Sequence, residues 1–155
     1  GNEKLGRILE VDLKNKTINE IDIHRNIIKK YLGGTGFAID YLMKQKAFEF
    51  DPLSENNPFV LMTGLLTGTT FPCSGFYTVS ARSPLTNIYG EGASGGFFGA
   101  ELRKSLNGVV FKNKADSPVY LVIEDEHYEL KDASKIWGLT TDKIIPDLHL
   151  KLSKQ

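Results

Sequence analysis

A glycine-rich stretch from Gly90 to Gly96 carries the strongest indication of chemistry in this sequence. It is followed by apolar residues at Phe98, Leu102 and Leu106, a spacing that predicts a helix. Glycines before a helix leave backbone amides uncovered at the positive end of the helix dipole, where phosphate or another anion binds well. We therefore predict a turn at Gly90–Gly96 that either binds a ligand or only allows close packing.

A second candidate is the segment from Gly64 to Gly75, which is rich in glycine, threonine and proline and has no hydrophobic periodicity. We predict an ordered loop, which could be purely structural or could form the rim of a ligand site. Its cysteine, Cys73, has no nearby base in the sequence, and we interpret it as a small buried residue rather than a nucleophile. His127 follows three acidic residues and is best explained by a solvated hairpin tip.

Cysteine and histidine are too few for the chain to hold a metal centre by itself. It has one cysteine and three histidines among 155 residues, whereas an iron–sulfur cluster usually requires four thiolates. We assign no catalytic residue and no metal ligand to the chain. A single cysteine fits a reducing cytoplasm, which is where we expect the protein.

Charge and hydropathy limit the other classes of partner. Lysine plus arginine and aspartate plus glutamate both number 19, so a basic surface for nucleic acid is not expected. No run of apolar residues is long enough to cross a membrane, and no secretion signal opens the chain. The protein is therefore predicted to bind neither nucleic acid nor membrane.

The elements that must position these segments are short strands with helices between them. Alternation predicts a hairpin over 7–13 and 18–23, and strands at 59–62, 76–82, 109–112, 118–124 and 127–131. Helices are predicted after Ile27, after a cap at Thr35, after Asp132 around Trp137 as a core anchor, and from Thr141. We predict an α+β fold with two antiparallel or mixed β-sheets and short interspersed helices, in one domain spanning 1–155.

Several motifs together resemble the tungsten-containing aldehyde ferredoxin oxidoreductase family, in its N-terminal domain. The matching segments, in the same order as in the family, are Gly6–Leu13, Tyr31–Gly36, Gly64–Thr69, Ser83–Thr86, Ser94–Leu102, Asp125–His127 and Asp132–Gly138. The likeness covers nearly the whole chain. It implies a domain with two β-sheets that forms a base for the cofactor.

This resemblance also implies an activity. Members oxidise aldehydes to carboxylic acids with tungsten, or sometimes molybdenum, held by two pterins beside a 4Fe–4S cluster, and they pass the electrons to ferredoxin. The cluster ligands lie in later domains of the family. We therefore expect this chain to be the first part of a longer enzyme, inactive and without cofactor alone, with the remaining domains, ferredoxin and a small aldehyde as partners; a homodimer stays open.

Site residues follow from the same resemblance. Gly95 matches a position whose backbone contacts the pterin, and Ser94 and Gly96 flank it. Ala93 stands where better-known members have a cofactor-binding asparagine, and Phe76 stands where they have an arginine. Arg82, six residues along the strand and about 20 Å away, cannot replace that arginine.

Two alternatives of another class remain. The chain could be a stand-alone module that binds a pterin or phosphate without redox chemistry, or a structural subunit used in assembly. A gene that continues into cysteine-bearing sequence favours the enzyme, and a gene that stops soon after Gln155 favours a module.

Overall fold

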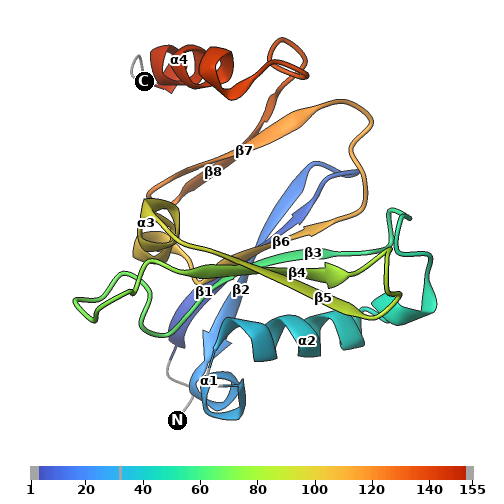
Figure 1. The fold of residues 1–155 in the computed structure, drawn as a ribbon, viewed down its shortest axis with the longest axis vertical. Helices are drawn as coiled ribbons and strands as arrows, with labels where there is room; N and C mark the ends of the chain where they lie inside the picture. Colours follow the sequence, from blue (N-terminus) through green and yellow to red (C-terminus); the bar gives the residue numbers. More distant parts are fainter. Residues whose placement is uncertain (1–3, 32, 153–155) are drawn as a thin grey trace. The chain divides into compact units, whose positions relative to one another are not determined.

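The computed structural model describes residues 4–31 and 33–152 and confirms the predicted α+β class (Figure 1). The chain separates into two compact units, residues 1–114 and 115–155, and each is described by itself. Within the described part of the chain, no helix is both long and apolar enough to cross a membrane.

The first unit is built on a six-stranded sheet in the order β2-β1-β6-β3-β4-β5. In chain order the strands are β1 Lys4–Asp12, β2 Thr17–His24, β3 Phe59–Thr63, β4 Tyr77–Arg82, β5 Tyr89–Ser94 and β6 Gly108–Lys112. Neighbouring strands are antiparallel except β1 and β6, which run parallel. The predicted first hairpin is β1 and β2, and the edges of the sheet are β2 and β5.

Strand β5 replaces most of the turn that we predicted at Gly90–Gly96, so that prediction was wrong. Tyr89–Ser94 pairs with all of β4, from Ser94 opposite Tyr77 to Tyr89 opposite Arg82. Glycine weakens a strand because it has no side chain to pack, and this strand is supported by its pairing with β4 instead. The actual change of direction is at Gly96, where φ is 105°.

The helices of this unit are α1 Arg25–Tyr31, α2 Gly34–Lys44, the short 3-10 helix η1 Ala47–Glu49, and α3 Phe97–Ser105. Helix α2 crosses one face of the sheet, and its Ala38 and Leu42 are completely buried against that face (Figure 1). We predicted Thr35 as its cap, which was wrong: the N-cap is Gly33, and no side chain caps the helix.

The second unit contains the hairpin of β7 Val119–Glu124 and β8 His127–Asp132, followed by α4 Thr141–Leu152. The predicted strands and last helix are thereby confirmed. The short helix predicted after Asp132 is a series of turns instead, in which Asp132 Oδ1 accepts hydrogen bonds from the N–H and hydroxyl of Ser134. Trp137 is 72% exposed, so its predicted role as a core anchor was wrong.

Candidate functional site

Helix α2 covers only part of its face of the six-stranded sheet. Under the helix, Val60 of β3 and Ser80 of β4 are buried. The helix begins at the end of β3, where a Cβ added to Gly34 would lie only 2.6 Å from the Cβ of Met62. Thr78 and Phe76 come next along the same face as Ser80, because alternate residues of a strand point to the same side. This part of the face is partly exposed, and Phe76 is 54% exposed.

A cleft of about 500 Å³ lies over this uncovered part of the face. Small-molecule sites usually have volumes of roughly 300–1,000 Å³. Three separate segments line the cleft: Gly33–Thr35 at the start of α2, residues 64–67 and 71–74 of the glycine-rich loop, and residues 76–78 at the start of β4. The loop was predicted as a possible rim, whereas the glycines before α2 were not predicted to belong to a site.

Hydroxyl groups hold the loop in shape. Thr67 Oγ1 accepts a hydrogen bond from the N–H of Gly64 and donates one to the carbonyl of Phe76, both at 2.8 Å. Ser74 Oγ donates to the carbonyl of Thr69 at 2.7 Å, and the N–H of Gly68 donates to the carbonyl of Ser74 at 2.9 Å. The ordered loop is therefore confirmed, and it is both a hydrogen-bonded structure and the rim of a cleft.

Glycines allow the backbone of this loop to pack directly against the start of α3. A Cβ added to Gly75 would lie 2.6 Å from the carbonyl oxygen of Gly96, and one added to Gly99 would lie 2.9 Å from the carbonyl oxygen of Gly75. Only residues without side chains allow backbones to approach this closely. The two segments singled out in the sequence are thus in direct contact, and close packing at Gly99 is part of the reason for their glycines.

The free edge of β5 presents backbone amides in a fixed pattern. The N–H of Ser83 donates to the carbonyl of Ile88 at 2.8 Å, so the backbone carbonyl of Ile88 points toward the chain of β4. On β4, the N–H and C=O of Arg82 bond to the side chain of Asn57 and so point away from β5. Along an antiparallel strand, successive residues direct their backbone groups to opposite sides. Tyr89, Glu91 and Ala93 therefore point their N–H and C=O groups toward the free edge.

The residues expected to contact the cofactor lie at the end of this edge. Ala93 and Ser94 close β5, Gly95 follows directly, and Gly96 is the N-cap of α3 without a side-chain cap. All four are exposed. The alternation, carried one step past the strand, gives the amide of Gly95 the same direction as that of Ala93. The sequence-based choice of residues thus falls on exposed main chain next to the cleft.

Phe76 directly precedes β4, whereas Arg82 is its last residue. A Cβ added to Gly95 would lie 3.5 Å from Cε1 of Phe76, so the ring lies beside Gly95 across the sheet edge. The guanidinium of Arg82 donates instead to the carbonyls of Asn87 and Phe50. It binds two loops at the far end of the strand, as expected for a residue that cannot reach Gly95.

A polar chain runs along the first half of β5, at the end away from Gly95. The hydroxyl of Tyr89 donates to Glu91 Oε2 at 2.6 Å, and Ser80 Oγ lies 2.8 Å from the same hydroxyl. Burial and the hydrogen bond to Glu91 raise the pKa of Tyr89 to about 12. Tyr89 therefore stays protonated near neutral pH and fixes the Glu91 carboxylate on the edge strand.

The other candidate residues have simpler environments. Cys73 is exposed, lines the cleft and has φ of 61°, so its predicted burial was wrong. His127 lies at the tip of the β7–β8 hairpin with its side chain 73% exposed, which confirms the predicted solvated tip. Among the described residues, no three His, Cys, Asp or Glu side chains gather where they could hold a metal ion.

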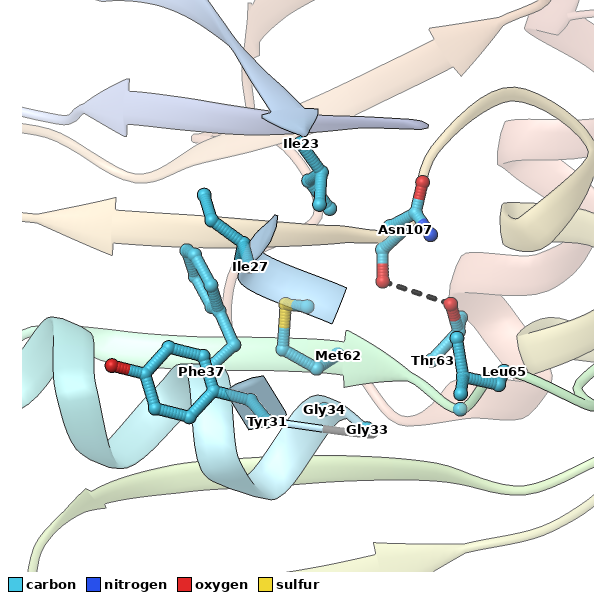
Figure 2. A pocket seen from close by; sticks show the side chains of 11 residues that line it. Ile23, Ile27, Tyr31, Gly33, Gly34, Phe37, Met62, Thr63, Leu65 and Asn107 are labelled. Atoms are coloured by element: carbon cyan, nitrogen blue, oxygen red, sulfur yellow. Dashed lines mark hydrogen bonds between the residues drawn. The ribbon is translucent and has the colours of Figure 1, made fainter. Parts of the chain in front are cut away.

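A second, much smaller hollow of about 30 Å³ lies where α1, α2 and the end of β3 meet (Figure 2). Its lining is mostly apolar and includes Ile23, Phe37 and Met62, while Thr63 Oγ1 donates to the carbonyl of Asn107 at 2.8 Å. Such a space holds about one or two water molecules. We interpret it as a packing gap and assign the cleft as the candidate site.

Comparison with known proteins gives a consistent family. Residues 8–155 match the model of the aldehyde ferredoxin oxidoreductase N-terminal domain. The tungsten-containing aldehyde ferredoxin oxidoreductase of Pyrococcus abyssi is 45% identical over 134 residues, which cover 86% of this chain and 22% of that protein. The enzyme of the same name from Thermococcus kodakarensis is 35% identical over 97% of this chain and 24% of its own length.

A solved structure and a further relative extend this family. A chain of the active-site complex BamBC of benzoyl coenzyme A reductase superposes with a TM-score of 0.91 and 30% identity, over 96% of this chain and 23% of that chain. The aliphatic sulfonate oxidoreductase WOR-like subunit of Pyrococcus furiosus is 35% identical over 86% of this chain. This chain spans less than a quarter of the length of each of these proteins. It belongs to the aldehyde ferredoxin oxidoreductase family and corresponds to the N-terminal domain of these tungsten enzymes.

Proposed function

We propose that this chain, residues 1–155, is the domain that seats a bis-pterin tungsten or molybdenum cofactor in an oxidoreductase that converts aldehydes to carboxylic acids and passes the electrons to ferredoxin. The observation that carries the proposal is the free edge of β5 with its backbone amides at Ala93 and Gly95, because Gly95 lies against Phe76, which lines a cleft of about 500 Å³. Both compact units belong to this domain in the proposal, because the family match extends over both.

The residues present fit one side of such a cofactor. Gly95 and Gly96 have no side chains, and nothing lies within 4 Å of a Cβ added to Gly96, so a flat group can approach the main chain. Backbone N–H groups suit the acceptor atoms of a pterin and its phosphate. With one cysteine in the chain, the ligands of a 4Fe–4S cluster must come from the rest of the polypeptide.

The bound cofactor would supply the oxidation of the aldehyde and the transfer of electrons to the cluster and ferredoxin. The contribution of this chain is binding and orientation. Ala93 and Gly95 donate main-chain hydrogen bonds, Ser94 and Gly96 keep the path of the chain around them, and the 64–75 loop bounds the cleft. No side chain here is proposed to transfer a proton, and the chain is proposed to be inactive by itself.

The test replaces a main-chain donor in the full-length gene product. Ala93→Pro removes the N–H that points to the free edge without removing a bond to β4, and proline is tolerated at such an edge position. Ala93→Ser keeps the N–H and serves as the matched control. We expect Ala93→Pro to lose most of its pterin and tungsten, measured per protein chain by pterin fluorescence and metal analysis, and Ala93→Ser to keep both.

Two results would overturn this proposal. A full-length product without pterin, tungsten or molybdenum would favour a module that binds a phosphate ligand or serves in assembly. Equal cofactor content in both Ala93 variants would show that the cofactor does not bind at the β5 edge. Because relatives are named for aliphatic sulfonate and benzoyl coenzyme A, activity should be assayed on those substrates beside aldehydes. Two further parts of the proposal, the reduction of ferredoxin and the location in the cytoplasm, are also tested with the full-length protein.

A further inference from the structure

Phe76 holds an unusual position between the cleft and the free edge of β5. Its ring lines the cleft, and on one side it lies against Gly95, with Cε1 and Cζ 3.5 and 3.6 Å from an added Cβ. Yet the residue is 54% exposed. A large apolar ring that stays half exposed inside a concave site is a common feature of ligand pockets.

The neighbouring aromatic residue is already partnered, whereas Phe76 is not. The ring of Tyr77 packs edge-on against Phe98, with centroids 5.1 Å apart and an interplanar angle of 66°. Among the residues that the structure describes, no other aromatic ring packs against Phe76. The residue that lies against the ring, Gly95, has no side chain to cover it.

We propose that Phe76 is the platform on which the planar heteroaromatic ring of the ligand stacks. This inference rests on the proposed function and deepens it by naming the residue that recognises the flat ring. The amides of Ala93 and Gly95 point within the plane of the sheet, beyond its edge, and so can bond the polar rim of a heterocycle. Phe76 projects from the face of the sheet and supplies the apolar contact that a hydrogen-bonding edge lacks. Together these contacts select a ligand that is flat, aromatic and rich in acceptors.

The occupant is taken to be a small ring system because of the form of the site. Phe76 lies in a cleft whose volume of about 500 Å³ is that of a small-molecule site. Phe97 provides a contrast: it is 90% exposed, follows the same glycine turn and does not line the cleft. A polypeptide covering the whole apolar surface would use both rings, whereas a ligand in the cleft would use only Phe76.

The experiment measures retention of the pterin by the full-length protein. Phe76→Leu removes the ring and keeps an apolar side chain, Phe76→Trp restores a larger ring, and Phe97→Leu makes the same change outside the cleft. Each protein is gel-filtered repeatedly, and the remaining pterin is released, oxidised and quantified by fluorescence. We expect Phe76→Leu to release pterin about tenfold faster than the wild type, and Phe76→Trp and Phe97→Leu to retain it like the wild type.

Each other outcome has a definite meaning. Equal release from Phe76→Leu and the wild type overturns the inference but leaves the proposed function intact, whereas absence of pterin from the wild type removes both. Equal losses from Phe76→Leu and Phe97→Leu, or a loss in Phe76→Trp as large as in Phe76→Leu, would point to a polypeptide contact and overturn the stacking role. If Phe76→Leu does not fold by circular dichroism, Phe76→Met, which has a similar volume without a ring, takes its place.

Discussion

Replacing Gly75 by alanine tests the junction between the 64–75 loop and α3. The added Cβ would lie 2.6 Å from the carbonyl oxygen of Gly96. Ordinary contacts between carbon and a carbonyl oxygen are about 3.3 Å or longer, so one backbone must move by about 0.7 Å. Gly75 does not have a positive φ, so the close contact is the only source of strain.

The size of the effect follows from this overlap. Inserting a methyl group into a well-packed region costs about 1–3 kcal/mol. Because Gly75 is only half-buried and Gly96 is exposed, the junction can shift, and we expect a value near the lower end, about 1 kcal/mol. The shift would also move Gly95 and Gly96 relative to the cleft, so cofactor retention in the full-length protein should fall together with stability.

Gly92→Ala is the matched control. Gly92 is exposed, has no positive φ, and an added Cβ there would lie 3.5 Å from Val79 Cγ2, which is an ordinary contact. Urea unfolding of the 155-residue chain should therefore give a lower midpoint for Gly75→Ala and a nearly unchanged midpoint for Gly92→Ala. Equal midpoints for the two variants would show that the loop does not press against α3, and the described site would lose its support.

Two further predictions concern pH and thiol access. Burial of the Glu10 carboxyl opposes ionisation, but hydrogen bonds from Lys112 and Tyr41 hold the pKa of Glu10 below its ordinary value of 4.5. Ionised Glu10 therefore stabilises the fold above about pH 4.5 and loses this effect as the pH falls through its folded pKa. Glu10→Gln should be about 1 kcal/mol less stable at pH 7. Its free energy of unfolding, measured by urea titration, should also depend less on pH in the acid range. Exposed Cys73 should react with a maleimide in the native chain, which mass spectrometry can measure. Bound cofactor in the full-length protein should slow this reaction. Slow labelling of the chain alone would contradict the open cleft.

The pattern of strands and helices could be predicted where hydrophobic periodicity is strong. The hairpin of β1 and β2, the buried β3 and the helix α3 with Leu102 on its inner side all follow from spacing alone. Strand β5 could not be predicted in this way, because Gly90 and Gly92 interrupt its pattern and its main support is pairing with β4. The one available signal was that the chain after the turn at 83–88 is long enough for a strand of the same length as β4.

The candidate site was predictable in its parts but not in its assembly. The glycine-rich segments were visible in the sequence, and their contact through Gly75, Gly96 and Gly99 was not, since contact between distant segments depends on the sheet register. The start of α2 was missed for a related reason. Thr35 has the chemistry of a cap, but the helix begins one residue earlier, at Gly34, where the close approach to Met62 leaves no room for a side chain.

The alternation along β5 has a consequence for how this protein can change over evolutionary time. Every residue type except proline carries the same N–H group, so the proposed ligand contacts through the backbone of Ala93 and Gly95 place no requirement on the side chain at position 93. Side chains around the cleft other than Phe76 could then change, and substrate preference with them, while the backbone contacts to the bound group persist.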